Sequence, residues 1–147
     1  MSRDQLKLVQ KLADRQEKEA ASRLSSAQGS LASAQGQLNQ VLGYRSDYHR
    51  LAIGADGTAT DTGKLQTARK FLSELDGIAG RQQKTVQQAE LLLEQHRTAW
   101  IEAKRRQTAI SRLREARASE RSKIDEKRHQ QLLDALFLTQ RSLSAVR

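Results

Sequence analysis

The chain has 147 residues, 37% of them hydrophobic and 29% charged, and it contains five aromatic residues, no proline, no cysteine and a net charge of +9. The shortage of aromatic side chains argues against a thick globular core, and the lack of cysteine excludes both a disulfide framework and a thiolate metal site. No segment approaches the run of about 20 apolar residues that a membrane span requires. The predominance of Ala, Glu, Lys, Leu, Arg and Gln is typical of long helices and coiled coils.

A first helix is predicted over about residues 4–52. Its apolar and small side chains recur in steps of three and four, which places them on one seam, the line of side chains that faces a partner helix. Many of these positions hold Ala or Gln, so we expect thin contacts. With slips after Ala20 and Val41, the predicted seam consists of Leu6, Val9, Ala13, Gln16, Ala20, Leu24, Ala27, Leu31, Ala34, Leu38, Val41, Tyr44, Tyr48 and Leu51.

Residues 53–63 are rich in Gly, Thr and Asp and lack apolar periodicity, which indicates a loop. A second, longer helix is predicted over about residues 64–140. Its seam holds Leu65, Ala68, Leu72, Leu75, Ala79, Gln82, Val86, Ala89, Leu93, His96, Trp100, Ala103, Gln107 and Ile110, and the same frame continues through Arg114, Arg117, Arg121, Ile124, Arg128, Gln131, Ala135 and Leu138.

One helix, one break and a longer helix predict an all-α fold, an antiparallel two-helix coiled-coil hairpin that forms a single elongated domain over residues 1–147. If residue 52 faces about residue 63, residue 4 faces about residue 111. The second helix then has no partner from about Ser111 onward. This overhang begins strongly basic and ends with an apolar cluster from Leu132 to Leu138, which indicates a docking or self-association surface.

Nothing in the sequence points to catalysis. The three histidines are far apart, and there is no phosphate-binding glycine loop and no metal-binding helix motif. A two-helix rod also offers no concave pocket for a substrate. We therefore predict a protein with no catalytic residue, metal site, cofactor or small-molecule substrate.

The positive charge is concentrated near the C-terminus, since residues 101–147 hold twelve Lys or Arg and six Asp or Glu. Such a run could bind phosphates, but acidic residues interrupt it and no aromatic platform accompanies it for single-stranded nucleic acid. A solvated helix face is the simplest interpretation. If the run docks on a partner, a protein is favoured over nucleic acid.

Three of the five aromatic residues are predicted to meet beside the loop. Tyr44 and Tyr48 are four residues apart on one helix face, and the hairpin places Phe71 and Leu75 alongside them. The tyrosine rings could be buried against Leu72, as core. Alternatively, they point outward with Phe71 and Leu75 and form an amphipathic patch suited to a binding hot spot. From the residues alone, both arrangements remain open.

Two features of this layout carry a family resemblance: the spaced pattern Gln37, Val41, Tyr44, Tyr48, Phe71 and Leu75, and the run from Trp100 to Arg106. In these residues, and in its length and helix order, the chain resembles the FliJ family, the small coiled-coil components of the bacterial flagellar type III export apparatus. It departs from the family pattern at Val41, where Leu is usual, at Ile78, which replaces a small residue, and at Gln82, which replaces His.

The resemblance implies a fold like the central stalk of rotary ATPases. It also implies a non-enzymatic role in the cytoplasm, peripheral to the inner membrane at the flagellar base. There the protein would link the hexameric export ATPase to the membrane export gate protein and assist export chaperones. Carried over, the gate-binding residues are Gln37, Val41, Tyr44, Tyr48, Phe71 and Leu75, and on this basis we predict that the patch points outward. The ATPase-ring-binding residues are Arg112, Arg114, Arg117, Arg121, Leu133, Leu136 and Phe137 of the overhang.

Two other functions remain open from the residues alone: a generic coiled-coil scaffold that self-associates through its overhang, and a basic coiled coil that binds nucleic acid. A pull-down from a cell extract separates them from the first. Export ATPase and gate protein in the eluate would support the flagellar function.

The hairpin predicts a monomer, because most of the seam pairs within the chain. Small-angle scattering should then give a maximum dimension of about 115 Å, the length of a helix over residues 63–139. A compact globule would contradict the hairpin. A maximum dimension of about 200 Å, that of open helices laid end to end, would indicate pairing between chains.

Overall fold

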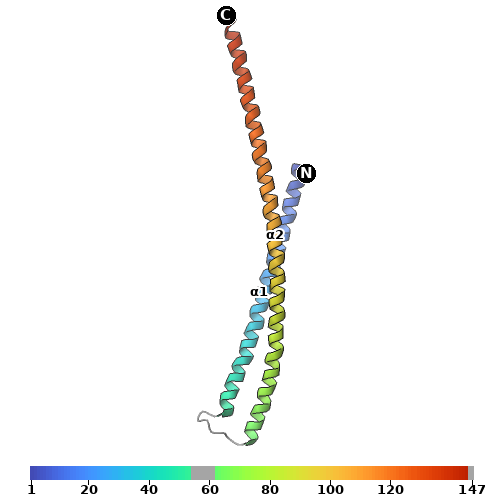
Figure 1. Ribbon diagram of the computed structural model, residues 1–147, viewed down its shortest axis with the longest axis vertical. Helices are drawn as coiled ribbons and strands as arrows, with labels where there is room; N and C mark the ends of the chain where they lie inside the picture. Colours follow the sequence, from blue (N-terminus) through green and yellow to red (C-terminus); the bar gives the residue numbers. More distant parts are fainter. Residues whose placement is uncertain (54–61, 146–147) are drawn as a thin grey trace. The chain divides into compact units, whose positions relative to one another are not determined.

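The computed structural model describes residues 1–53 and 62–145, and nearly all of them are helical (Figure 1). Helix α1 spans Arg3–Ile53 and helix α2 spans Thr62–Ala145. No strand occurs in these described ranges. The two packed helices, the second one longer, confirm the predicted all-α arrangement. The predicted loop falls mainly on residues 54–61, which lie outside the described residues.

A reciprocal pair of hydrogen bonds fixes the start of α1. The Ser2 backbone N donates to Gln5 Oε1 at 2.8 Å, and the Gln5 backbone N donates to Ser2 Oγ at 3.2 Å. This is the capping box, which satisfies two backbone donors that a helix N-terminus otherwise leaves without a partner. The cap therefore sets where the first turn begins, and with it the positions of Arg3 and Leu6.

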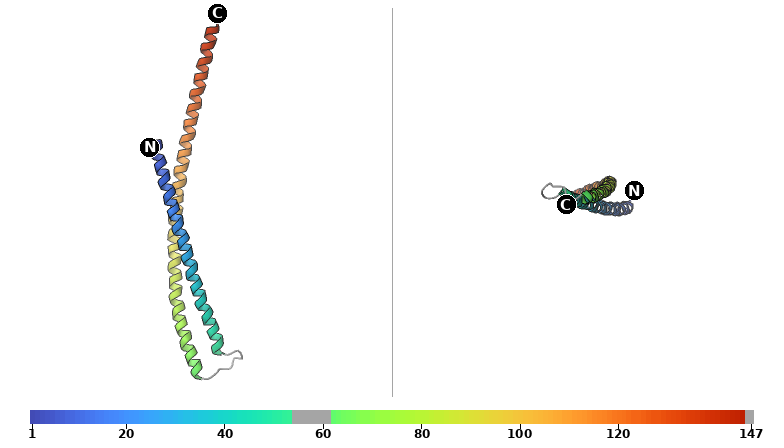
Figure 2. Two further views of the ribbon diagram at one scale, coloured as in Figure 1. Left: turned by 180° about the vertical axis from the view of Figure 1, so that it is seen from behind. Right: turned by 90° about the horizontal axis from the view of Figure 1, so that it is seen from below.

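The described chain divides into two compact units, which we describe separately. Unit 1 comprises Met1–Gln16 and Ala103–Arg147, and unit 2 comprises Glu17–Glu102. In unit 2 the two helices run antiparallel and side by side in the views of Figures 1 and 2. Side-chain contacts agree with this direction: Glu17 meets Trp100, Ala34 meets Gln82, and Arg45 meets Asp76.

The seam of α2 is the predicted one. Every seam position from Leu65 to Ile110 is buried or half-buried, and nearly all residues between them are exposed. The regular spacing keeps one face of α2 against α1 over many turns. The prediction from spacing alone is therefore confirmed for this stretch.

The seam of α1 is more regular than predicted. Its buried residues are spaced by seven: Leu6, Ala13, Ala20, Ala27 and Ala34. Val41 continues this series as a half-buried residue, and Leu24, Leu31 and Leu38 form the second, half-buried series. The two predicted slips are absent, and Tyr44 and Leu51 are exposed rather than on the seam.

Polar side chains on the seam link the helices of unit 2. Trp100 Nε1 donates to Glu17 Oε1 at 3.0 Å, and Gln82 Nε2 donates to the Ala34 carbonyl oxygen and to Gln37 Oε1, both at 3.1 Å. A hydrogen-bonded polar pair is satisfied in one register only, because a shifted helix leaves its atoms unpaired. These bonds therefore specify the alignment that small apolar side chains leave loosely defined.

Unit 1 shows a different register from the one predicted. Ser111 lies opposite Gln10 and not residue 4, since Ser111 Oγ donates to Gln10 Oε1 at 3.2 Å. Arg117 Nη1 reaches the Met1 carbonyl oxygen at 2.7 Å. The predicted register was wrong because it placed residue 52 opposite residue 63. The contacts of unit 2 instead place the end of α1 opposite residues about one helical turn after the start of α2. Every described residue from Ala118 to Ala145 is exposed, so the unpaired part of α2 begins about two turns later than predicted.

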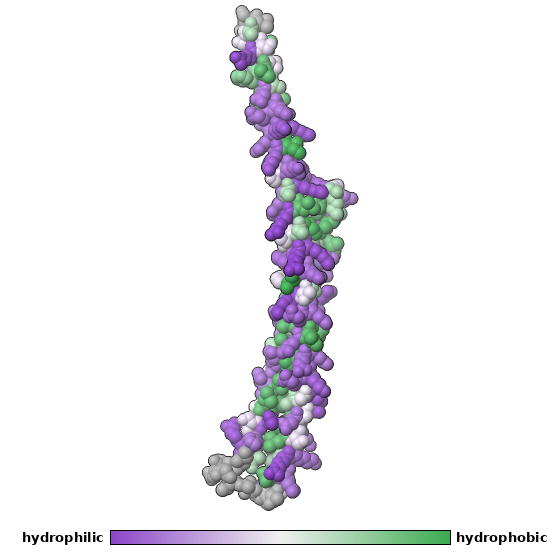
Figure 3. Space-filling view, viewed as in Figure 1, coloured by the Kyte–Doolittle hydropathy of each residue, from purple (hydrophilic) through white to green (hydrophobic). Residues whose placement is uncertain are grey.

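The surface is mostly polar. The face drawn in Figure 3 is largely hydrophilic, with hydrophobic residues in small separate areas. Neither α1 nor α2, over its described residues, contains a stretch long and apolar enough to cross a membrane.

Leu75→Ala should destabilise the helix pair more than a matched surface change. An alanine methyl on the seam contributes about 0.8 kcal/mol, whereas a buried Leu or Val contributes about 1.5–3 kcal/mol. Leu75 is among the few large buried side chains. We expect its truncation to lower the free energy of unfolding by about 2–3 kcal/mol, measured by urea denaturation followed by circular dichroism. Leu91→Ala, on the exposed side of α2, should change it by less than about 0.5 kcal/mol. Equal effects would contradict the seam.

Candidate functional site

Two surfaces of this helix pair are candidates for docking, one in each unit. The first, which we call the aromatic patch, consists of Tyr44 and Tyr48 of α1 with Phe71 of α2. The rings of Tyr48 and Phe71 are in contact, with centroids 4.3 Å apart and ring planes at 34°. Aromatic pairs in proteins contribute about 0.5–1.5 kcal/mol beyond the area they bury. The pair therefore joins α1 to α2 and also holds both rings in place.

The rings of the aromatic patch reach solvent. Tyr44 is 54% exposed, Tyr48 is 38% exposed and Phe71 is 39% exposed. Tyr48 follows the seam series by seven and so leans on α2, whereas Tyr44 lies off that series and projects further. The hydroxyl of Tyr44 accepts a hydrogen bond from Gln40 Nε2 at 2.9 Å. The outward arrangement predicted from the sequence is therefore confirmed for these three rings.

Other residues of the predicted gate-binding set have different surroundings. Leu75 is only 6% exposed and belongs to the seam, so the prediction that it points outward with the rings is wrong. It lies one turn from Phe71 on α2 and packs in the core beneath that part of the surface. Val41 is half-buried, and Gln37 is exposed and accepts the bond from Gln82. The three rings thus form the centre of the patch, and the side chains of Val41 and Gln37 form its edge.

An ion pair holds the two helices together near the aromatic patch. Arg45 Nε lies 2.6 Å from Asp76 Oδ1, with both side chains about half exposed. Exposed pairs of this kind contribute about 0–1 kcal/mol, so the contact serves alignment more than stability. Arg45 occupies a seam position on α1, and the pair limits how far the helices can slide near the rings.

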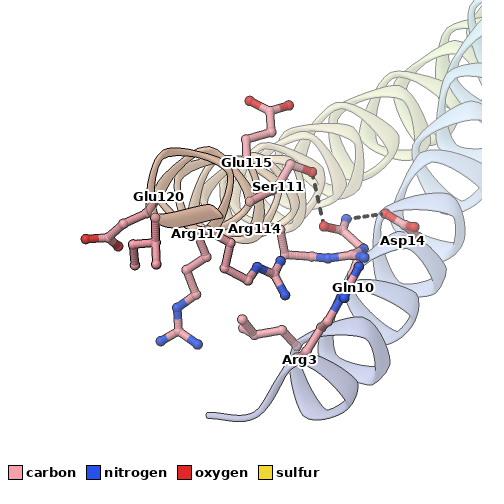
Figure 4. A pocket seen from close by; sticks show the side chains of 12 residues that line it. Arg3, Gln10, Asp14, Ser111, Arg114, Glu115, Arg117 and Glu120 are labelled. Carbon is pink, nitrogen blue, oxygen red and sulfur yellow. Dashed lines mark hydrogen bonds between the residues drawn. The ribbon is translucent and has the colours of Figure 1, made fainter. Parts of the chain in front are cut away.

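The second surface is a groove of about 860 Å³ in unit 1, which we call the arginine groove (Figure 4). It lies between the start of α1 and the part of α2 that faces it. The lining combines four arginines with carboxylates, amides and a few apolar side chains: Arg3, Leu6, Gln10, Asp14, Ser111, Arg114, Glu115, Arg117, Ala118, Glu120, Arg121 and Ile124.

Amide and hydroxyl groups link the helices at the inner end of the arginine groove. Gln10 accepts from Ser111 and donates through Nε2 to Asp14 Oδ1 at 2.9 Å. Gln107 Nε2 donates to the same Asp14 oxygen at 2.8 Å. The carboxylate of Asp14 thus accepts hydrogen bonds from the amides of both glutamines. This network keeps the first turns of α1 close to α2.

The arginines of the groove outnumber its carboxylates. Four arginines share the lining with Asp14, Glu115 and Glu120, and Arg117 donates to the Met1 carbonyl oxygen. Figure 4 shows the side chains of Glu115 and Glu120 extending away from Arg114 and Arg117. The lining therefore carries a small excess of positive charge.

The predicted ATPase-binding residues fall into three places. Arg114, Arg117 and Arg121 lie in the arginine groove, whereas Arg112 is exposed and does not line it. The apolar residues Leu133, Leu136 and Phe137 are all exposed on the part of α2 that has no partner in unit 1. The prediction that they lie outside the hairpin core is confirmed.

Sequence reasoning missed Arg3, Leu6 and Ile124 as members of this surface. The prediction assigned Leu6 and Ile124 to seams and gave Arg3 no role. The error lay in the predicted register, which placed the start of α1 opposite residue 111 and left residues 114–124 without a neighbouring helix. The missing information was which polar seam residues bond to each other.

No group of three or more His, Asp or Glu side chains in the described ranges is arranged to hold a metal ion. Both surfaces are suited to binding other proteins, since they lie along helices and combine exposed rings or arginines with apolar edges.

The model of the family described as the flagellar FliJ protein matches residues 1–144 of the chain. No curated protein and no solved structure matches the chain.

The double change Tyr44→Ala with Tyr48→Ala should leave the helix pair folded. Tyr44 is mostly exposed, and Tyr48 loses only its contact with Phe71 and the seam edge. We expect the free energy of unfolding to fall by about 1 kcal/mol, within the range of partly exposed positions. Thermal denaturation followed by circular dichroism measures this. A variant that is unfolded at room temperature would show that the rings are essential core.

Proposed function

This chain belongs to the FliJ family and is therefore a component of the flagellar export apparatus, and on that premise we propose that it couples the hexameric export ATPase to the membrane export gate. It does so without catalysis, as a protein that binds one partner through each of two surfaces. The family match over residues 1–144 carries this proposal, because it spans both units and both surfaces.

Two separate surfaces are the physical requirement of a coupling protein. If both partners bound the same residues, each would displace the other. Here the aromatic patch belongs to unit 2 and the arginine groove to unit 1, so the two share no residue. Their chemistry also differs, since one is aromatic and nearly neutral and the other is cationic. That difference favours two distinct partners.

The aromatic patch is the proposed gate-binding surface. Tyr and Phe rings are common in hot spots, where a rigid apolar ring is buried and a hydroxyl finds a polar partner. Contact between Tyr48 and Phe71 holds these rings before binding, which lowers the entropy lost on association. Gln37 and Val41 would form the edge of this interface, and Leu75 would support it from beneath.

The arginine groove and the exposed part of α2 form the proposed ATPase-binding surface. Arg114, Arg117 and Arg121 would supply charge, and Leu133, Leu136 and Phe137 would supply apolar area. Phe137 is 66% exposed, and burying such a ring contributes about 1.5–3 kcal/mol. Arg112, which lies outside the groove, would contribute less.

Export chaperones are further proposed partners, and the proposed location is the cytoplasmic side of the inner membrane at the flagellar base. A self-associating scaffold would instead use the exposed leucines between copies, and a nucleic-acid-binding coiled coil would use the arginines on phosphates. Both are outcomes that the following experiments can reveal.

Pull-downs with two variants should separate the two surfaces. Tyr44→Ala with Tyr48→Ala should abolish recovery of the gate protein and export-dependent motility while the ATPase is still recovered, because only the aromatic patch changes. Leu51→Ala, an exposed apolar residue on the same helix, is the matched control and should retain both partners. Loss of both partners from the tyrosine variant would contradict two separate surfaces.

Removal of residues from Asp125 onward should weaken ATPase binding and leave the gate interaction intact. Since the removed residues are exposed in unit 1, the melting temperature should change little. Intact ATPase binding combined with a large fall in melting temperature would indicate that this segment folds back on the chain. Recovery of nucleic acid, or of a second tagged copy, in place of ATPase and gate protein would favour the other two functions.

A further inference from the structure

The seam of α2 changes its chemistry opposite the first residues of α1. Up to Ile110 the seam is apolar or neutral, and every one of its positions is buried or half-buried. From Arg114 the same frame brings mainly arginines, followed by apolar positions near the C-terminus: Arg114, Arg117, Arg121, Ile124, Arg128, Gln131, Ala135 and Leu138. A seam is the face of a helix that a partner helix covers. Over this stretch of unit 1, however, α1 covers only the first two positions.

The first arginines of this series line the arginine groove. Arg114 and Arg117 are half-buried, while Arg121 and Ile124 are exposed at the outer edge. Leu6, which is almost fully buried, lies at the inner side. Half-burial raises the energetic cost of a charged arginine side chain, because water solvates it less well. A carboxylate placed in the groove would offset that cost through charge-assisted hydrogen bonds.

We propose that the arginine groove binds an acidic amphipathic helix of a partner protein. This helix lies along α2 beyond Arg117, where α2 extends past the start of α1 at Arg3 and has no neighbour in unit 1. Its carboxylates face the cluster Arg3, Arg114, Arg117 and Arg121. Its apolar side chains cover Ile124 and Ala118. The seam positions of α2 from Arg121 to Leu138 are all exposed, so such a helix could pack along several further turns.

Charge complementarity selects this occupant over a second copy of the chain. The seam positions from 114 to 138 contain no Asp or Glu, so another α2 brings no carboxylate to the arginines at these positions. In a parallel pair it would bring arginine against arginine. Like charges facing each other across a helix interface oppose association.

The lining also favours a helix over a polyphosphate or a nucleic acid strand. Phosphate binding would use the arginines but would leave Ala118 and Ile124 uncovered. Glu115 and Glu120 on the flanks of α2 would repel a backbone charged at every unit. An amphipathic helix can instead place carboxylates on one stripe and apolar side chains on the next.

This inference rests on the proposed function only for which protein supplies the helix. The chemistry of the occupant follows from the groove itself, and it can be tested without the ATPase or the gate protein.

The test uses the full chain and two designed peptides of about 20 residues, long enough to form a helix on binding. The acidic peptide carries Glu at the positions that face the arginines and Leu at those that face Ile124, and the neutral peptide replaces each Glu by Gln. We expect the acidic peptide to bind at least about tenfold more tightly by fluorescence anisotropy. The difference should shrink as salt is raised from about 50 mM to about 500 mM, because salt screens exposed charges.

A pair of matched variants locates the binding. Arg114→Gln with Arg121→Gln should remove most of the preference for the acidic peptide. Arg105→Gln with Lys127→Gln removes the same two charges from exposed positions outside the groove, and it should keep the preference. Circular dichroism should show unchanged helix content in both.

Three results would overturn the inference: equal affinity for the two peptides, equal loss in both double variants, or tighter binding of tripolyphosphate or single-stranded DNA than of the acidic peptide. Failure of the proposed function looks different. In that case the ATPase is not recovered from cell extract, while the peptide preference and its loss in the groove variant remain.

Discussion

The whole structure depends on one thin contact, the seam between α1 and α2. On α1 its buried positions recur every seven residues and are mostly alanine, while Leu75 and Val86 are the large buried side chains of α2. Because an alanine methyl contributes less than half of what a buried Leu does, neither helix has a deep core to rely on. Stability must come from many small contacts in register over a long distance. The other features of the molecule follow from that register.

Polar groups on the seam decide the register. Small apolar side chains would tolerate a shift of one heptad, since alanine would again meet an apolar neighbour. The bonds Glu17–Trp100, Ala34–Gln82 and Asp14–Gln107 would not, because a shift would leave partly buried donors and acceptors without partners. The same register determines where α2 loses its neighbour, and so which of its arginines are half-buried and which are open.

Both candidate surfaces are consequences of how the seam ends. Near the end of α1, Tyr48 still follows the seam series and stacks on Phe71, while Tyr44 lies off it and stays exposed. At the start of α1, the seam of α2 continues into arginines without a facing helix. In each unit the packing thus holds part of a surface rigid and leaves the rest uncovered. That combination suits the docking roles proposed for a member of the FliJ family.

The sequence by itself determined the helices and the seam of α2, because regular spacing and the lack of proline act locally and leave few alternatives. It also carried the family resemblance, which supplied most of the case for outward tyrosines. It did not determine the absence of slips in α1, the burial of Leu75 away from the patch, or the place of Arg3 beside Arg114 and Arg117. Those depend on which residues of two distant segments face each other. Only the tertiary structure decided that, because hydrogen bonds between polar side chains far apart in the chain set the alignment, and spacing within one helix contains no information about its partner.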